Sequence, residues 1–189
     1  MKTPAQAIRI GIDNYYTVYE DAIKKLWEHE TTVAGLPIVH WFIAQAVQES
    51  RFDNLAVSPV GAKGIAQFMD ATAKEVEKEL KHLELFKNGF NRENATQSIY
   101  AQVHYMNKLF KTWKVKRTNA SRMQLALASY NAGAGSIIKA QKFSGEKKHW
   151  LEIKNHLEKV TGKNSKETIK YVSIITDFAV IIEDYKQDK

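Results

Sequence analysis

Cysteine is absent from this chain of 189 residues. A disulfide scaffold, a thiolate metal site and a cysteine nucleophile are therefore excluded, and the stability of the fold has to come from packing. Long apolar runs are also lacking, because the longest, residues 38–47, is interrupted by His40 and Gln45. A membrane-spanning helix needs roughly 20 apolar residues. We interpret this segment as a core helix and expect no insertion into a membrane.

The N-terminus lacks the features of an export signal. Residues 1–10 carry Lys2, Pro4 and Arg9 among short apolar residues. A secretory signal peptide has a continuous apolar stretch instead. We predict that no signal peptide is present.

Compositional bias is also missing. Hydrophobic residues make up 44% of the chain and charged residues 26%, as in folded globular proteins, and the length suits one domain. The formal net charge of +7 favours polyanionic partners such as nucleic acid, anionic lipid or the polymers of a bacterial envelope, without choosing among them. The densest basic stretch comprises Lys111, Lys114, Lys116, Arg117 and Arg122.

Helical periodicity dominates the sequence. Apolar residues recur at helical spacing, as in Ile99, Val103 and Met106, whereas alternating strand-like runs are hard to find. We predict an all-α (mainly α) fold. The helices are expected near residues 4–28, 37–49, 66–80, 95–113, 121–132, 134–142, 147–160 and 165–186. We expect one domain, residues 1–189, with residues 1–36 forming a helical N-terminal extension packed on the rest.

Glu49 occupies an unusual position for a carboxylate. It lies at the C-terminal end of the predicted helix that starts near Pro37, directly after the apolar stretch. The partial negative charge of a helix C-terminus and desolvation by apolar neighbours both favour the protonated form. A protonated acid near neutral pH can protonate a leaving group. Glu at a helix end is nevertheless more often a surface residue, so the position alone does not establish a role.

The sequence around Glu49 resembles the soluble lytic transglycosylase family. The matching residues are Glu49-Ser50-Arg51-Phe52, Ala56-Val57-Ser58, Gly61-Ala62-Lys63-Gly64-Ile65-Ala66-Gln67, Met69 and Thr72-Ala73. The family pattern is a catalytic Glu-Ser, an aromatic residue, an Ala-x-Ser turn, Gly-Ala-x-Gly-Leu-x-Gln, Met-Pro and Thr-Ala. This chain departs from it at Ile65, for Leu, and at Asp70, for Pro. We expect the Asp70 side chain to cap the following helix.

Two later blocks extend the resemblance. Residues 126–133, Ala-Leu-Ala-Ser-Tyr-Asn-Ala-Gly, resemble the family's Ala-x-Tyr-Asn-Ala-Gly, although Ala134 replaces the usual Pro. Residues 167–172, Glu-Thr-Ile-Lys-Tyr-Val, resemble the Glu-Thr-x-x-Tyr-Val segment of the family. The resemblance covers roughly residues 38–175, whereas residues 1–36 match no known pattern.

The resemblance implies a set of site residues. Glu49 is expected to be catalytic, and the expected substrate-binding residues are Ser58, Gln67, Met69, Tyr130, Asn131, Glu167 and Tyr171. The Ser58 hydroxyl can project from a turn before Pro59, and the Gln67 amide can donate to and accept from a sugar acetamido group. Local sequence alone would place Met69 in the core, and Tyr130 could be structural if its phenol finds a partner.

The implied activity is that of a peptidoglycan lytic transglycosylase with a lysozyme-like fold. Such an enzyme cleaves the β-1,4 bond between N-acetylmuramic acid and N-acetylglucosamine and leaves a 1,6-anhydro end, without metal or cofactor. The expected partner is the peptidoglycan glycan strand, and we expect a monomer that does not bind nucleic acid. We expect a bacteriophage endolysin, which would collect in the host cytoplasm and be released to the periplasm or cell wall for lysis. A virion-associated enzyme used at entry stays open as another setting.

Two alternatives remain open. Goose-type lysozymes share this general fold, so a lysozyme-type muramidase is the first alternative. It would require a second carboxyl group near Glu49, for which Asp70 and Glu167 are the candidates. The second alternative is a basic module that has lost catalysis and binds envelope polymer or nucleic acid.

Overall fold

The computed structural model describes residues 2–187, and these residues are mainly α-helical. In chain order the elements are α1 (Pro4–Leu26), β1 (Thr32–Val33), β2 (Leu36–Pro37), α2 (Ile38–Ser50), α3 (Asp70–Leu80), η1 (Glu84–Phe86), α4 (Ala95–Thr112), α5 (Asn119–Ala132), α6 (Ala134–Phe143), α7 (Trp150–Ile153), η2 (Lys154–His156), α8 (Glu158–Thr161), η3 (Gly162–Asn164) and α9 (Ser165–Gln187). The predicted all-α class is confirmed.

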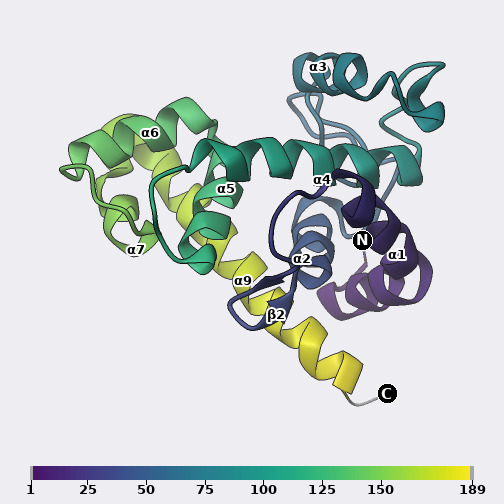
Figure 1. Cartoon of the computed structure of the whole chain (residues 1–189), viewed down its shortest axis with the longest axis horizontal. Helices are drawn as coiled ribbons and strands as arrows, with labels where there is room; N and C mark the ends of the chain where they lie inside the picture. Colours follow the sequence, from purple (N-terminus) through teal and green to yellow (C-terminus); the bar gives the residue numbers. More distant parts are fainter. Residues whose placement is uncertain (1, 188–189) are drawn as a thin grey trace.

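Helix α2 forms the centre of the fold. Residues 38–47 are all buried, and α2 packs mainly against α1 and α9. Figure 1 shows α9, drawn in yellow, running from the end of the molecule that holds α6 and α7 past α2 to the C-terminus. The core helix predicted from the apolar run is therefore confirmed. None of the helices in residues 2–187 is long and apolar enough to cross a membrane.

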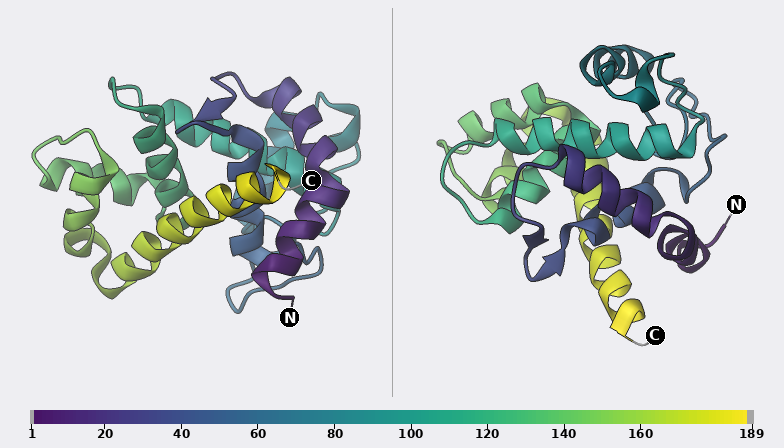
Figure 2. Two further views of the ribbon diagram at one scale, coloured as in Figure 1. Left: turned by 90° about the horizontal axis from the view of Figure 1, so that it is seen from below. Right: turned by 45° about the vertical axis from the view of Figure 1, so that its right-hand side comes forward.

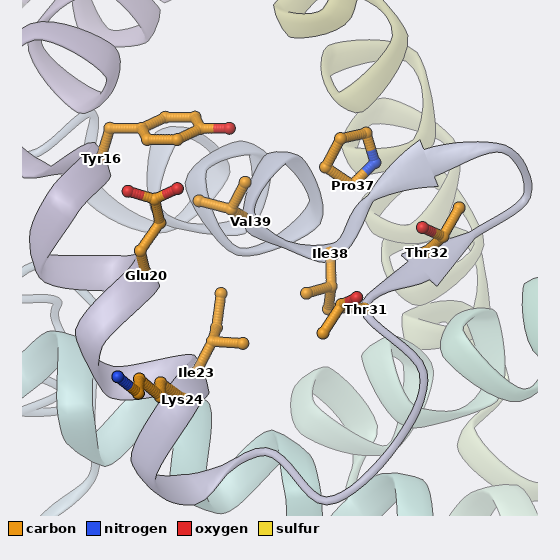
Figure 3. A pocket seen from close by; sticks show the side chains of 9 residues that line it. All are labelled: Tyr16, Glu20, Ile23, Lys24, Thr31, Thr32, Pro37, Ile38 and Val39. Atoms are coloured by element: carbon orange, nitrogen blue, oxygen red, sulfur yellow. The ribbon is translucent and has the colours of Figure 1, made fainter.

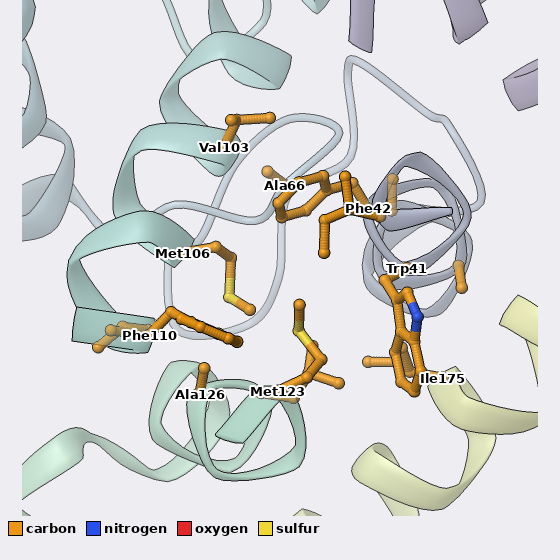
Figure 4. Packing of buried hydrophobic residues seen from close by; sticks show 14 of the residues in the cluster. Trp41, Phe42, Ala66, Val103, Met106, Phe110, Met123, Ala126 and Ile175 are labelled. Atoms are coloured by element: carbon orange, nitrogen blue, oxygen red, sulfur yellow. The ribbon is translucent and has the colours of Figure 1, made fainter. Parts of the chain in front are cut away.

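The core lies where α2, α4, α5 and α9 meet. Trp41 and Phe42 of α2 point toward Met106 of α4 and Met123 of α5, and Ile175 of α9 closes the same cluster (Figure 4). All five side chains are almost inaccessible to solvent. Because these contacts join residues far apart in sequence, they hold α2 in a defined place relative to α9.

Helix α1 packs across α2 and α4 (Figure 2). Its start is fixed by a capping box, in which the Thr3 hydroxyl accepts from the Gln6 N–H and the Gln6 side chain accepts from the Thr3 N–H. A Cβ added at Gly11 would lie 2.6 Å from Ile43 Cγ2, so the two helices approach closely at this glycine. The description of residues 1–36 as an extension of one domain remains a prediction.

Two predicted helices differ from the structure. The helix expected over 66–80 begins only at Asp70, because Lys63 and Phe68 pair through both backbone hydrogen bonds at 3.1 Å and Gln67 adopts a φ of 49°. The segment 147–160 is divided into short helical turns rather than one helix. The expected cap by Asp70 is wrong. Met69 is the N-cap residue, and Asp70 pairs instead with Lys74 at 2.8 Å.

A small hairpin was not predicted. Strands β1 and β2 pair antiparallel through Thr32 with Pro37 and Val33 with Leu36. Ala34 and Gly35 connect them with φ values of 54° and 80°, and two successive positive φ values are typical of a tight hairpin turn. Two-residue strands are too short to show an alternating pattern, so the sequence carried no periodic signal for them.

Candidate active site

The end of helix α2 positions Glu49. The helix stops because Arg51 and Phe52 adopt left-handed φ values of 55° and 56°, which reverse the chain. The Ser50 hydroxyl donates to the Ile65 carbonyl at 2.9 Å, so the loop after the helix is tied to the last helical turn. Glu49 is thereby held at the edge of the core, with its side chain partly buried.

The surroundings of Glu49 favour its protonated form. Burial raises the pKa of Glu49 from 4.5 to about 7, against the opposing effect of a hydrogen bond from Tyr171. The Tyr171 hydroxyl donates to Oε1 of Glu49 at 2.5 Å. Among the described residues no second carboxyl group contributes to this shift. This direction agrees with the expectation from the sequence that Glu49 favours its protonated form, and burial is the main physical cause.

A cavity of about 330 Å³ opens beside Glu49. Its other lining residues are Pro4, Val47, Gln48, Ser50, Arg51, Asp53, Ala56 and Phe178. Asp53 is the second carboxylate in this wall, but it is exposed and its Oδ1 accepts from the Leu55 N–H at 3.0 Å. The Asp53 carboxyl group therefore stabilises the turn after α2. Glu49 remains the candidate acid of this cavity.

Tyr130 lies close enough to Glu49 for a negative charge on the Glu49 carboxylate to affect ionisation of the Tyr130 phenol. Burial, and next the negative charge of Glu49, raise the pKa of Tyr130 well above its usual range. The Tyr130 hydroxyl donates to the Ala66 carbonyl at 2.6 Å, and its ring packs edge-on against Phe68 and Tyr105. The phenol thus has the structural partner that a buried tyrosine requires, and it connects α5 to the loop in front of α3.

Replacing Tyr130 by Phe should affect both activity and stability. The substitution leaves the Ala66 carbonyl without its hydroxyl partner, and we expect the free energy of unfolding to fall by about 1–2 kcal/mol. Because Ala66 precedes Gln67, the loop should also lose its alignment with Glu49, lowering kcat/KM by about tenfold. Urea unfolding and turnover of purified peptidoglycan would measure the two effects. A loss of stability with unchanged turnover per folded molecule would make Tyr130 purely structural.

The loop residues expected to bind substrate differ in which of their atoms are left for a ligand. The Ser58 hydroxyl accepts from the Ala62 N–H at 3.0 Å, which leaves its proton available to a ligand. Gln67 Nε2 donates to the Ala56 and Gly64 carbonyls, so the amide oxygen is the atom of this side chain that is left to accept from a sugar. Met69 is 44% exposed, so it is a surface residue rather than a core one.

Asn131 and Glu167 lie together in a separate cavity of about 260 Å³ between the end of α5 and the start of α9. The Thr168 hydroxyl donates to Oδ1 of Asn131 at 2.7 Å. Glu167 is exposed, and it precedes Tyr171 by one helical turn. The structure therefore brings Glu49, Tyr171 and Tyr130 together. It places Glu167 one turn of α9 away from Tyr171, in the same cavity as Asn131 of α5.

Another cavity, of about 500 Å³, lies between α1 and the hairpin (Figure 3). Its carboxylate, Glu20, is exposed, and none of the expected site residues lines it. Residues 2–187 also contain no group of three or more His, Asp or Glu side chains placed to hold a metal ion. The cavity beside Glu49 is therefore the better candidate for a catalytic site.

Three residues near the site were not identified from the sequence. Tyr105 packs against Tyr130, and the buried Gln45 and Gln102 are hydrogen-bonded to each other at 2.9 Å. A signal for Gln45 existed, because it interrupts the apolar run of α2. Nothing in the local sequence of α4 distinguishes Gln102 from a surface glutamine, and only the packing of α4 on α2 reveals it.

Residues 39–153, more than half of the chain, match the family described as the transglycosylase SLT domain. The chain belongs to this family.

Three curated relatives of this SLT domain are all named membrane-bound lytic murein transglycosylase F. The protein of Haemophilus influenzae (strain PittEE) is 30% identical over 132 residues, which is 68% of this chain and 25% of that protein. The protein of Histophilus somni (strain 2336) is 29% identical over 136 residues, 70% of this chain and 26% of that protein. The protein of Saccharophagus degradans is 29% identical over 174 residues, 82% of this chain and 32% of that protein.

Solved structures show the same fold as this SLT domain. The 70 kDa soluble lytic transglycosylase of Escherichia coli superposes with a TM-score of 0.69 at 19% identity, over 91% of this chain and 24% of that chain. An inactive mutant of the lytic transglycosylase Slt of Pseudomonas aeruginosa superposes with a TM-score of 0.62 at 23% identity, over 92% of this chain and 24% of that chain. The predicted lysozyme-like lytic transglycosylase fold is confirmed. The chain spans about a quarter to a third of the length of these curated relatives and solved chains.

Proposed function

We propose that this SLT domain is a peptidoglycan lytic transglycosylase in which Glu49 acts first as general acid and then as general base. The observation that supports it most strongly is a single, partly buried carboxyl group with a pKa of about 7, facing a cavity. General acid and base catalysis is most efficient when the pKa lies near the working pH. The solved Pseudomonas aeruginosa relative is an inactive mutant in which Gln replaces a Glu, which agrees with a catalytic glutamate in this family.

The proposed reaction balances with one carboxyl group. Protonated Glu49 gives its proton to the glycosidic oxygen of N-acetylglucosamine as the bond to C1 of N-acetylmuramic acid breaks. The acetamido group of the substrate supports the positive charge at C1. Glu49, now a carboxylate, takes the proton of the C6 hydroxyl, and O6 bonds to C1 to close the 1,6-anhydro ring. Because the attacking hydroxyl belongs to the same sugar, the reaction gains the advantage of proximity.

Ser58, Gln67, Met69, Asn131 and Glu167 are proposed to bind the sugars on either side of the broken bond. Their positions support this assignment. Met69 offers an exposed thioether, Ser58 a hydroxyl proton and Gln67 an acceptor oxygen in the loop that Tyr130 holds near Glu49. Asn131 and Glu167 line a polar cavity one turn further along α9.

Mass spectrometry of the muropeptides released from purified peptidoglycan would test the proposed function. A lytic transglycosylase releases anhydro ends, which are lighter by one water than reducing ends. Reducing ends would instead indicate the muramidase alternative, with Asp70 or Glu167 as the second carboxyl group. No products above those of the Glu49→Gln variant would support the alternative of a binding module without catalysis.

The dependence of activity on pH should follow the pKa of Glu49. Because the reaction starts from the protonated acid, kcat/KM should fall as the pH rises through about 7. Roughly nine-tenths of the free enzyme is active at pH 6 and roughly one-tenth at pH 8. Initial rates on soluble glycan strands between pH 6 and pH 8 would measure this fall in kcat/KM. A rate that is constant between pH 6 and 8 would contradict this assignment.

We also propose that the enzyme acts on the cell envelope during lysis, as a bacteriophage endolysin does, by itself as a monomer and without nucleic acid. The net charge of +7 supports contact with an anionic envelope. The relatives named above are membrane-bound bacterial enzymes, so envelope remodelling by the cell itself is the competing setting. Expression in bacteria with and without a pore-forming protein would separate the two, because an endolysin should lyse the cells only when the pore is present.

A further inference from the structure

A continuous chain of buried hydrogen bonds connects helix α1 to Glu49. The Tyr19 hydroxyl donates to Oε1 of Gln102 at 2.7 Å. Gln102 Nε2 donates to Oε1 of Gln45 at 2.9 Å, and Gln45 Nε2 donates to the Tyr171 hydroxyl at 3.1 Å. Tyr171 then donates to Glu49. The links come from α1, α4, α2 and α9, which converge at the centre of the molecule (Figure 1).

The side chains of this chain are removed from solvent. Tyr19, Gln45 and Gln102 are completely buried, and Tyr171 is 5% exposed. Leaving a polar group without a partner inside a protein is costly, so such groups are retained where their hydrogen bonds are satisfied. Tyr19 lies outside residues 39–153, the segment that matches the family model.

The direction of every hydrogen bond in the chain is fixed by one backbone group. Gln102 Nε2 also donates to the Phe42 carbonyl at 3.0 Å, which can only accept. The Gln102 amide nitrogen therefore faces α2, and its oxygen faces Tyr19. Since Gln102 presents a donor to Gln45, the Gln45 amide must place its oxygen toward Gln102 and its nitrogen toward Tyr171.

This arrangement leaves one direction for the proton of Tyr171. Because the phenol oxygen accepts from Gln45, its single proton cannot point back along the chain and is donated to Oε1 of Glu49. With Oε1 occupied, the acid proton of Glu49 belongs on Oε2. The Gln45 nitrogen also contacts the Met106 sulfur at 3.7 Å, so a soft neighbour stabilises this orientation of the amide.

We propose that Tyr19, Gln102 and Gln45 are positioning residues for the proposed acid. They orient the Tyr171 hydroxyl toward one carboxyl oxygen of Glu49 and thereby reserve the other for the proton that is transferred. None of the three contacts the cavity beside Glu49, so they act through Tyr171 alone. This inference rests on the proposed function of Glu49, but its test does not depend on turnover.

The test is a ¹³C NMR titration of the Glu49 carboxyl group, assigned by its absence in Glu49→Gln. In Gln102→Met the Gln45 amide is free to turn and offer its oxygen to Tyr171, so the Tyr171 proton gains a competing acceptor. Glu49 then loses part of a bond that favours its ionised form, and its acid dissociation constant should fall roughly threefold. Tyr171→Phe, which removes the bond entirely, should shift the constant further in the same direction.

Gln97→Met is the matched control. Gln97 is a buried glutamine of the same helix α4, and its amide bonds to the Leu85 and Gly89 carbonyls and to the Asn91 N–H, remote from Tyr171. This variant should lose stability and leave the titration of Glu49 unchanged. The other charged or titratable groups around Glu49 are Tyr171 on α9, Tyr130 on α5, and Arg51 and Asp53 in the following turn. All of them are intact in both glutamine variants.

An unchanged dissociation constant of Glu49 in folded Gln102→Met would overturn the proposal. Should Gln102→Met not fold, Gln45→Met provides the same measurement, because it removes the donor that fixes the Tyr171 hydroxyl, and an unchanged constant there would also overturn it. The proposed function fails by a different outcome. A shifted constant in Gln102→Met together with full turnover by Glu49→Gln would retain the hydrogen-bond chain and reject Glu49 as the acid.

Discussion

Replacing Glu49 by Gln should reduce turnover of peptidoglycan by about a thousandfold or more, because the proposed mechanism uses the same carboxyl group to give and to take a proton. The amide keeps the shape of the side chain and can still accept from Tyr171, but it has no proton to transfer at neutral pH. The measurement is the rate of release of anhydro muropeptides. Turnover close to that of the unmodified chain would reject the mechanism.

The same variant should be more stable than the unmodified chain at alkaline pH. Folding raises the pKa of Glu49 from 4.5 to about 7, so the folded state binds more protons than the unfolded state between these values. The stability that this group contributes is present in full below pH 4.5 and is lost as the pH rises through about 7. The free energy of unfolding lost in this way between acidic and alkaline pH is about 3 kcal/mol. A neutral Gln at position 49 does not ionise and therefore loses none of it.

Urea unfolding of both proteins at pH 4 and pH 8 would measure this difference. We expect equal free energies of unfolding at the acidic pH and a more stable Glu49→Gln at the alkaline pH. Glu84→Gln is the control for the change of a carboxylate to an amide, because Glu84 is exposed in η1 and pairs with Lys87 at the surface. Glu84→Gln should retain turnover and show no comparable gain in the free energy of unfolding at pH 8. A less stable Glu49→Gln at pH 8 would contradict burial as the cause of the raised pKa.

Replacing Gly64 by Ala should lower the free energy of unfolding by about 4 kcal/mol. Gly64 has a φ of 77°, and an added Cβ would lie 1.8 Å from the Arg92 carbonyl oxygen and 3.2 Å from the Ser98 hydroxyl. A backbone atom cannot move aside as a flexible side chain can. Either the loop or the segment that leads into α4 must shift, and the loop carries Gln67 and Met69. Urea unfolding would measure the loss.

Gly61→Ala separates the effect of the contact with Arg92 from the effect of the positive φ. Gly61 has a similar φ of 84°, but an added Cβ would meet nothing within 4 Å. We therefore expect a loss of about 1–2 kcal/mol, the cost of a left-handed conformation for a residue with a side chain. Equal losses in the two variants would show that the contact with Arg92 is not the cause. Because the family pattern contains both glycines, the comparison also explains why they are not equivalent.

Local patterns determined most of the helices. The apolar period of α4 and the buried run of α2 predicted their positions to within a few residues, because burial of one helix face requires apolar residues at regular spacing. The start of α3 and the hairpin were not predicted. They depend on the pairing of Lys63 with Phe68 and on the positive φ values of Ala34 and Gly35, and these conformations are selected by the loop as a whole.

The sequence by itself determined the fold class, the family and the identity of Glu49 as the candidate acid, because each is carried by residue types in a fixed order along the chain. Only the tertiary structure decided the environment of that acid. The pKa of Glu49 depends on burial and on a tyrosine 122 residues away. Tyr171 in turn accepts from Gln45 of α2, which Gln102 of α4 orients. Hydrogen bonds and desolvation are short-range in space but not in sequence, so the chain had to be folded before they could be identified.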